Sequence, residues 1–569
     1  MQSLDTDILI LGSGGAGLFA ALHAHKAAPE RSVTVAVKGL LGKCGCTRMV
    51  QGGYNVALAK EDSIERHFMD TIEGGKWLPD QDLAWQLVTL AVERVKELEN
   101  ELGCFFDRNP DGTIHQKAFA GQTFDRTVHK GDLTGIEIIN RLAEQVWARR
   151  ISRLEEHRAV EIVKNRAGDA VAGVLMIDIR TGEYVFVRAR AVLLATGGGP
   201  TMYKYHTPSG DKSCDGLAMA LRAGLALRDM EMVQFHPTGL LAGAHTRMTG
   251  TVLEEGLRGA GGYLLNGARQ RFMPHYDRLA ERATRDVVSR SMFEEIRKGT
   301  TTPHGGLYLS MAHLGAERVA REFKGMVERC ADCGFDLAGG LVEVVPTAHY
   351  MMGGVEFRGD CGTALAGLFV AGEDSGGVHG ANRLGGNGVA NSTVFGAVAG
   401  DTMAAWVSQN ALQDADPATI DAAISACEAP FGRKSRGDFE AMREKLYDVM
   451  WDKVGIIRDA KGLSQAAGEL AALETELDAQ GLPDHNRAFN LTWHDWMNLK
   501  SLVVVSRAIA AAALARRDSR GAHFRSDFPD SGSLEHSAYT SLRADLSVSM
   551  KPVAFTRVRP GHSLLRNVA

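Results

Sequence analysis

The first forty residues alternate short apolar segments with one glycine-rich turn. Residues 7–11 are β-rich, GSGGAG follows them, LFAALHAHKAA has the apolar spacing of a helix, and SVTVAV forms a second strand. In such a strand–turn–helix–strand unit, the glycines of GxGxxG allow a tight turn, the close approach of a pyrophosphate and close packing of the helix. They are Gly12, Gly14 and Gly17 here, so the pattern predicts a dinucleotide site. The second strand ends in Lys38, where an acidic residue for the ribose is usual.

Further along the chain the periodicity is helical, then strand-like, then helical again. Leucines between residues 83 and 98 share one face of a predicted helix that Asp80 caps. Residues 158–192 alternate through turns at NRAGDA and RTGE, which predicts a β-meander leading into the strand VLLATGGG. Beyond Asp416, periodic runs such as FEAMREKLYDVM predict a helical bundle. From residue 520 the chain is polar and contains prolines, and we expect it to pack as an extended arm.

Two glycine-rich loops indicate where a ligand binds. GANRLGGNGVANS (Gly380–Ser392) follows the strand-like LFVAGE and contains one arginine, Arg383, among glycines that let the backbone approach a planar ligand. KCGCTRMVQGG at 43–53 has two cysteines one residue apart, which cannot complete a tetrahedral metal site, so we expect its backbone to wrap around a cofactor. Residues 240–345 carry their own elements and interrupt the cofactor-binding domain, so we interpret them as an inserted cap.

Composition narrows the class of protein. The 569 residues include 64 Lys and Arg against 69 Asp and Glu, which gives no sign of a nucleic-acid partner or a basic membrane anchor. The eight cysteines are scattered, as in a reduced intracellular protein, and the pair Cys330 and Cys333 lacks partners for a metal site, so we expect loop thiols and no metal. The N-terminus has no signal-peptide pattern, and the longest apolar run, Ser501–Ala515, is interrupted by Arg507. These features predict a cytoplasmic protein without a direct membrane span.

Several segments together resemble one protein family. They are FHPTG (Phe235–Gly239), EEGLRGAGGYLLN (Glu254–Asn266), RFMPHY with ATRDVVSR (271–290), VPTAHYMMGG (Val345–Gly354) and HGANRLGGN (His379–Asn387). In this order they are similar to the flavoprotein subunit of succinate dehydrogenase and fumarate reductase, and L-aspartate oxidases share most of them. The resemblance covers nearly the whole chain. It implies an α/β fold with a Rossmann-like FAD-binding domain (1–239 and 346–412), an inserted α+β capping domain (240–345), a C-terminal helical bundle (413–518) and a tail (519–569).

The resemblance also implies a set of site residues. FAD, bound without a covalent link, would be held by Gly12, Ser13, Gly14, Gly15, Gly17, Lys38, Cys46, Thr47, Gln51, Gly52, Gly53, Asp215, Glu373, Asn387, Gly388 and Val389. A small carboxylate substrate would contact His236, His349, Arg383, Phe119 and Glu254. Arg285 would be the proton donor, with Glu255 and Arg258 as the other members of its relay. Because arginine is very basic, it can serve in this way only beside a strongly basic, carbanion-like centre.

The implied activity is the interconversion of a dicarboxylate and its unsaturated partner, as succinate and fumarate, by hydride transfer at flavin N5. Two alternatives stay open, L-aspartate oxidase-like oxidation of an amino acid and dehydrogenation of a substituted succinate-like acid. Phe119 is typical of the succinate-type enzymes, whereas aspartate oxidases carry a glutamate there. The chain has no cluster-binding cysteine pattern, so the electron partner is open between a separate iron–sulfur subunit, a quinone and oxygen. If the protein associates with a membrane, partner subunits would make that contact.

Three positions depart from the family pattern. Cys46 stands where the family has the histidine that carries covalent flavin, and Gly388 replaces a serine. Glu254 replaces a threonine whose hydroxyl donates to a substrate carboxylate, and an ionised glutamate can only accept. Three explanations of Glu254 are open: a protonated carboxyl that still donates, an ion pair with a cation such as Arg258, or a substrate that presents a donor there.

Overall fold

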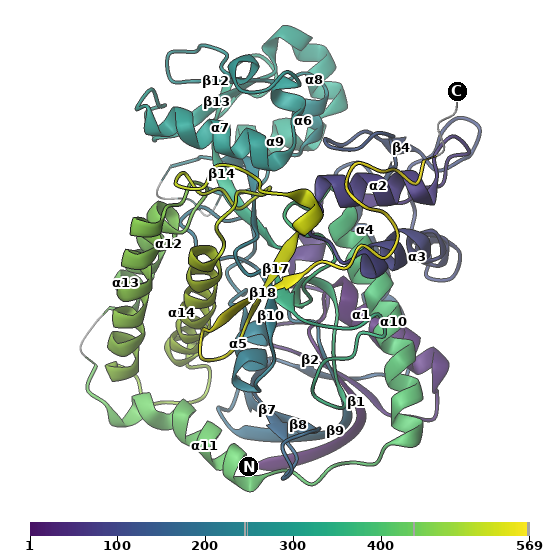
Figure 1. Cartoon of the computed structure of the whole chain (residues 1–569). Helices are drawn as coiled ribbons and strands as arrows, with labels where there is room; N and C mark the ends of the chain where they lie inside the picture. Colours follow the sequence, from purple (N-terminus) through teal and green to yellow (C-terminus); the bar gives the residue numbers. More distant parts are fainter. Residues whose placement is uncertain (244–245, 247, 436–437, 566–569) are drawn as a thin grey trace.

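Figure 1 shows the computed structural model of the chain, which describes residues 1–243, 246, 248–435 and 438–565. Residues 244–245 and 247 of the predicted cap, 436–437 of the predicted helical region and 566–569 of the predicted tail lie outside these ranges.

The main sheet is organised around β1 (Gln2–Leu11), as the sequence predicts. β1 pairs in parallel with β2 (Val33–Val37) and β9 (Tyr184–Leu194), and α1 (Gly15–Ala27) connects β1 to β2. Residues 8–11 are buried, as expected of a parallel strand that is covered on both faces. A Cβ atom at Gly17 would lie 2.0 Å from the carbonyl oxygen of Gly12, so glycine is required there for the close packing of α1.

The remaining strands extend this sheet in the order β6-β2-β1-β9-β8-β7, and β16 also pairs with β9. They are β6 (Ser152–Glu155), β7 (His157–Lys164), β8 (Val171–Asp178) and β16 (Leu368–Val370). The antiparallel pairing of β7, β8 and β9 confirms the predicted meander. α10 (Asn387–Gln409) runs parallel to α1, because Gly396 and Gly400 lie against the carbonyl oxygens of Ala16 and Ala20. Both helices therefore begin at the same edge of the sheet.

A small sheet and three helices lie beside this domain. The sheet contains β3 (Tyr54–Asn55), β5 (Thr127–Val128) and β4 (Gln116–Lys117), and the helices are α2 (Ile64–Gly74), α3 (Gln81–Asn100) and α4 (Thr134–Trp147). The Asp80 side chain accepts hydrogen bonds from the first N–H groups of α3, which confirms the predicted cap. Leu83, Leu87 and Leu98 are buried, whereas Leu90 is half-buried.

The cap is the teal unit at the top of Figure 1. It contains β12 (Tyr263–Leu265), β13 (Leu307–Ser310), α6 (Gly256–Gly259), α7 (Arg285–Arg297), α8 (Ala316–Glu322) and α9 (Lys324–Asp332). A separate hydrophobic core, with Leu264, Met292 and Leu309 at its centre, holds these elements together. β11 (Val233–Leu240) and β14 (Leu341–Met351) pair with each other and connect the cap to the rest of the chain.

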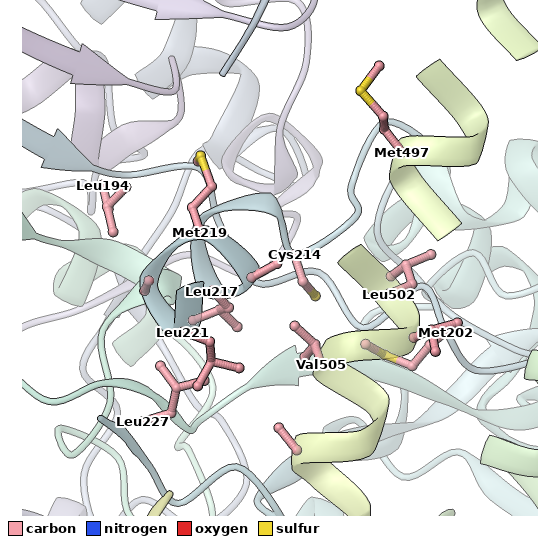
Figure 2. Packing of buried hydrophobic residues seen from close by; sticks show 14 of the residues in the cluster. Leu194, Met202, Cys214, Leu217, Met219, Leu221, Leu227, Met497, Leu502 and Val505 are labelled. Carbon is pink, nitrogen blue, oxygen red and sulfur yellow. The ribbon is translucent and has the colours of Figure 1, made fainter. Parts of the chain in front are cut away.

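The region beyond residue 416 is helical, as predicted. Its helices are α11 (Pro417–Glu428), α12 (Phe439–Lys453), α13 (Ala460–Ala479) and α14 (Leu491–Ala515). Figure 2 shows α14 beside α5 (Asp215–Arg222), and Leu502 and Val505 belong to the same buried cluster as Leu217 and Leu221. By length and mean hydropathy α14 would qualify to cross a membrane, but 67% of its apolar window is buried inside the protein, as in a core helix. The predicted lack of a membrane span stays a prediction.

The expectation of an extended C-terminal arm is wrong in one respect. Part of the tail forms a hairpin of β17 (Ala538–Leu542) and β18 (Val548–Pro552), which joins β10 (Leu227–Arg228) and β15 (Gly354–Val355) in a sheet. The hairpin forms because β10 offers an edge for pairing, which a local pattern does not reveal. The expectation of loop thiols is also wrong for Cys330, which is a buried, free cysteine within α9.

Candidate active site

One continuous pocket begins at the carboxyl edge of β1 and ends under the cap. Its first part is lined by Gly12, Ser13, Gly14, Gly15, Lys38, Cys46, Thr47, Gln51, Gly52, Gly53, Asp215, Glu373, Gly388 and Val389. Its second part is lined by Phe119, His236, Glu254, Glu255, Arg285, His349 and Arg383. The structure thus brings together most of the residues that the sequence indicates, although they come from both domains.

Three predicted residues are not among the described residues that line the pocket. Gly17 packs α1 onto the Gly12 carbonyl, as described above. The Asn387 side chain is bonded to His67 and Asn55 behind the pocket wall. Arg258 lies behind Glu255, and its Nη1 donates to the carbonyl of Glu281 at 2.7 Å. These residues support the pocket from outside.

Two helix N-termini face the first part of the pocket without a capping side chain. α1 has Gly14 at its N-cap, and α10 has Gly386, whose φ of +88° favours glycine. Such ends present free backbone N–H groups and a positive partial charge, which suit phosphate oxygens and electron-rich ring atoms. The N–H of Gly15 donates to Oγ1 of Thr47 at 3.1 Å, so Thr47 ties the second loop to this turn.

Lys38, just after β2, belongs to a half-buried cluster of charges. Its Nζ lies 2.9 Å from Oδ2 of Asp215 and 2.9 Å from Oγ of Ser213. Arg158 donates to the other oxygen of Asp215 at 2.8 Å. Burial would raise the pKa of Asp215, but Arg158 and Lys38 outweigh it and hold that pKa well below its ordinary value. Asp215 therefore supplies the carboxylate that is missing from the end of β2, and Arg158 is a pocket residue that the sequence did not single out.

The loop with Cys46 forms one wall of the pocket. Desolvation there, and secondarily Glu373, raises the pKa of the Cys46 thiol to about 12, so the thiol is protonated near neutral pH and is a poor nucleophile. Glu373 accepts hydrogen bonds from the N–H groups of Gly199 and Met351 at 3.2 and 2.9 Å. These bonds hold its carboxylate against the pocket.

The ring of Phe119, which lines the pocket, lies close to the backbone of Gly52 and Gly385. A Cβ atom at Gly52 would lie 2.4 Å from the Phe119 ring, and one at Gly385 would lie 2.7 Å from it. The same Cβ at Gly385 would lie 2.9 Å from Glu255 and 3.0 Å from Arg285. Glycine at both positions therefore lets the phenyl ring and the charged groups come close to the backbone.

Arg285, Glu255 and Arg258 belong to the cap and form a connected chain of charges. Nη2 and Nε of Arg285 donate to Oε2 of Glu255 at 2.7 and 3.1 Å, and Nη1 donates to Gln234 at 3.1 Å. Arg258 Nη2 donates to the other oxygen of Glu255 at 3.2 Å, one turn along α6. Burial alone would raise the pKa of Glu255, but the two guanidinium groups lower it below its ordinary value. Glu255 is therefore an anion shared by two cations.

His236 on β11 and His349 on β14 lie side by side, with ring centroids 5.4 Å apart. Desolvation, and then Arg285, lowers the pKa of both rings well below the usual value, so both are neutral near neutral pH. Nδ1 of His236 accepts the N–H of Thr238 at 3.3 Å, which places its proton on Nε2. Nδ1 of His349 is bonded to Oγ1 of Thr207 at 2.8 Å. Each ring is thus oriented by a neighbour.

Arg383 differs from the other buried arginines of the pocket. The residue is 6% exposed, and its guanidinium lies over the Tyr350 ring at 4.3 Å. Within the described ranges this guanidinium makes no ion pair and no hydrogen bond, and its Nε is buried without a partner. Burial, and secondarily Arg285, lowers the pKa of Arg383 to about 10, so it still carries its charge near neutral pH. A buried unpaired guanidinium is a strong site for a carboxylate.

Glu254 has a partner that the sequence did not suggest. Its Oε2 lies 3.5 Å from Nζ of Lys117 on β4, whereas Arg258 pairs with Glu255. The suggested ion pair of Glu254 with a cation is therefore present, but its cation is Lys117 and not Arg258, because the two successive carboxylates point to different cations. Lys117, Gln234 and Tyr350 are residues that sequence reasoning missed, since nothing local marks them as members of this site.

A family model described as FAD binding domain matches residues 7–389, and one described as fumarate reductase flavoprotein C-term matches residues 443–564. The chain belongs to the succinate dehydrogenase and fumarate reductase flavoprotein family. The 8-methylmenaquinol:fumarate reductase flavoprotein subunit of Wolinella succinogenes is 34% identical, over 97% of this chain and 91% of its own length. The fumarate reductase flavoprotein subunit of Escherichia coli is 34% identical, over 93% and 89%.

Solved structures of this family have the same fold. A variant of the quinol fumarate reductase FrdA of E. coli superposes with a TM-score of 0.92 at 31% identity, over 99% of both chains. This confirms the predicted fold class. Family membership also confirms FAD as the cofactor and makes the chain a flavin-dependent oxidoreductase. The two uncapped helix ends and the glycine-lined cleft of the pocket fit such a dinucleotide.

Proposed function

We propose that this flavoprotein interconverts a saturated carboxylic acid and its α,β-unsaturated partner, of the succinate and fumarate type. The observation that carries the proposal is Arg383, a buried guanidinium in the second part of the pocket that has no ion-pair or hydrogen-bond partner among the described residues. Such a group favours an anionic ligand, and Arg285 adds to the positive charge nearby. Two neutral imidazoles on β11 and β14 supply further donors to the same ligand.

The residues of the first part of the pocket would hold FAD. The N-terminus of α1 and the loop with Thr47 would bind its phosphates, and the Lys38 and Asp215 cluster would bind a ribose. The N-terminus of α10 would lie against its ring system. When bound, FAD supplies a two-electron acceptor or donor for the substrate.

Arg285 would hold or move the proton at the carbon next to the bound carboxylate. Hydrogen bonds to Glu255 and Gln234 hold the guanidinium of Arg285 in one orientation, so it is oriented before the substrate binds. Glu255 and Arg258 would restore that proton, since one carboxylate connects both guanidinium groups. Arginine can give up a proton only to a strongly basic centre, and the carbon beside a carboxylate held by Arg383 becomes such a centre during reduction.

The L-aspartate oxidase alternative has less support. Phe119 is apolar and packs against Gly52 and Gly385, so it offers no carboxylate for an ammonium group. The names of the relatives support a separate electron partner, because they describe the flavoprotein as one subunit of a larger enzyme. We therefore also propose an electron-carrying partner protein of the iron–sulfur type. A cytoplasmic location stays a prediction.

The proposal is tested by anaerobic turnover of the FAD-loaded protein with a reduced viologen dye. Oxidation of the dye that depends on an α,β-unsaturated acid is expected, with formation of the saturated acid. The proposal fails if no such acid supports turnover while L-aspartate reduces the bound flavin, since the alternative oxidation would then explain the site.

A further inference from the structure

Arg383 and Glu254 both line the pocket, and different charged groups surround them. The charged or titratable groups that act most strongly on Arg383 are Arg285, Tyr350, Glu373 and Glu255. Those that act most strongly on Glu254 are Lys117, Asp132 and Arg329. Arg285 is thus among the groups that act most strongly on Arg383 but not among those that act most strongly on Glu254, which lies in a different electrostatic environment.

Glu254 lines the pocket, whereas the three charged residues that act most strongly on it do not. Among the described residues, Lys117, Asp132 and Arg329 do not line the pocket, whereas Glu254 does. The residue is 7% exposed. Its Oε2 is buried, and the one ion pair of Glu254 in the described ranges is with Nζ of Lys117 at 3.5 Å, the outer limit of a hydrogen bond. The carboxylate thus keeps most of its capacity to accept hydrogen bonds.

We propose that Glu254 makes this pocket select a substrate with a carboxylate at one end and a hydrogen-bond donor, such as an amide, in place of a carboxylate at the other. The inference rests on the proposed function and names its substrate class. Burial raises the pKa of Glu254. While the group is ionised, a second carboxylate beside it would place two acceptors together with no proton between them, and their like charges would repel. A donor at that end would satisfy the free carboxylate oxygens of Glu254. The carboxylate end of the same molecule would bind Arg383.

Lys117 offers a matched control for this inference. It belongs to β4, outside the cap, whereas Glu254 belongs to the cap, so their ion pair also joins the two domains. A change of Lys117 to Met removes the ion pair but leaves the pocket-facing carboxylate in place. A change of Glu254 to Gln removes the negative charge, keeps the size, and adds an amide that can donate to a carboxylate.

The experiment compares kcat/KM for fumarate and for its monoamide in the anaerobic dye assay. The parent protein should prefer the monoamide by ~10-fold or more, because a buried like-charge contact is costly. Glu254→Gln should shift the ratio of the two kcat/KM values toward fumarate by ~10-fold or more. Lys117→Met should keep the preference for the monoamide or strengthen it. FAD content and thermal midpoint are measured for each variant, and Glu254→Thr serves as a second variant if Glu254→Gln does not fold.

Different results of this comparison would overturn the inference or the proposed function. A parent protein that uses fumarate better than the monoamide overturns the inference and leaves the proposed function intact. The inference is also overturned if Glu254→Gln and Lys117→Met shift the ratio of the two kcat/KM values equally. The ion pair of Lys117 and Glu254 would then only hold the two domains together. Turnover of neither compound, nor of any other α,β-unsaturated acid, is instead a failure of the proposed function.

Discussion

Replacing Arg285 with lysine tests the proposed proton relay. The arginine makes two hydrogen bonds to Glu255, at 2.7 and 3.1 Å, and one to Gln234 at 3.1 Å. Lysine has a single nitrogen on a flexible stem and cannot reproduce this planar fork. Loss of a positioned proton carrier should lower kcat by at least ~100-fold, which corresponds to ~2.7 kcal/mol of transition-state stabilisation. KM should change less, because Arg383 remains to bind the carboxylate.

The assay is anaerobic dye oxidation with the better of fumarate and its monoamide, together with the visible absorbance of bound FAD and the thermal midpoint. Arg290→Lys is a matched control on the same helix, since this arginine contacts Phe524 at 4.8 Å and is not among the described residues that line the pocket. The control should stay within a few-fold of the parent. If Arg285→Lys also keeps kcat within a few-fold while retaining FAD, Arg285 is not the proton carrier.

Three further predictions concern the cofactor, the substrate and stability. FAD should be released into the supernatant by acid precipitation, because desolvation raises the pKa of the Cys46 thiol to about 12; colour in the washed pellet would contradict this. Arg383→Ala should raise KM by ~10-fold or more with a smaller effect on kcat, and an unchanged KM would show that another group holds the carboxylate. Arg516→Met leaves the buried Glu231 without its ion pair and should lower the free energy of unfolding by ~3–5 kcal/mol in denaturant titrations. Lys551→Met, at a more exposed pair, should cost ~1 kcal/mol or less, and equal losses would refute the reasoning.

Features set by local pattern could be predicted from the sequence, whereas contacts between distant segments could not. The GxGxxG turn, the Asp80 cap and the meander depend on neighbouring residues, and the structure has them where the pattern indicates. The carboxylate beside Lys38 comes from Asp215, which is 177 residues away. Lys117 and Glu254 likewise meet only because the cap folds over β4.

The same distinction explains why the expectations of an extended C-terminal arm and of a loop position for Cys330 are wrong. β17 and β18 are short strands in a polar segment, and their stability depends on the edge of β10, which lies more than 300 residues earlier in the chain. The helix that contains Cys330 is one of the small elements of the cap, whose core residues are spread from 240 to 344. The resemblance to a family located the residues of the active site, but their partners required the structure.

The most direct test of the proposed activity is a single turnover of the bound flavin. FAD-loaded protein is reduced photochemically without oxygen and then mixed with fumarate or its monoamide, while the visible absorbance of the flavin and the product acid are followed. We predict that the absorbance returns with at least one of the two acids and that saturated acid forms in an amount equal to the flavin. A flavin that stays reduced with every α,β-unsaturated acid, while oxygen reoxidises it normally, would contradict the proposed function.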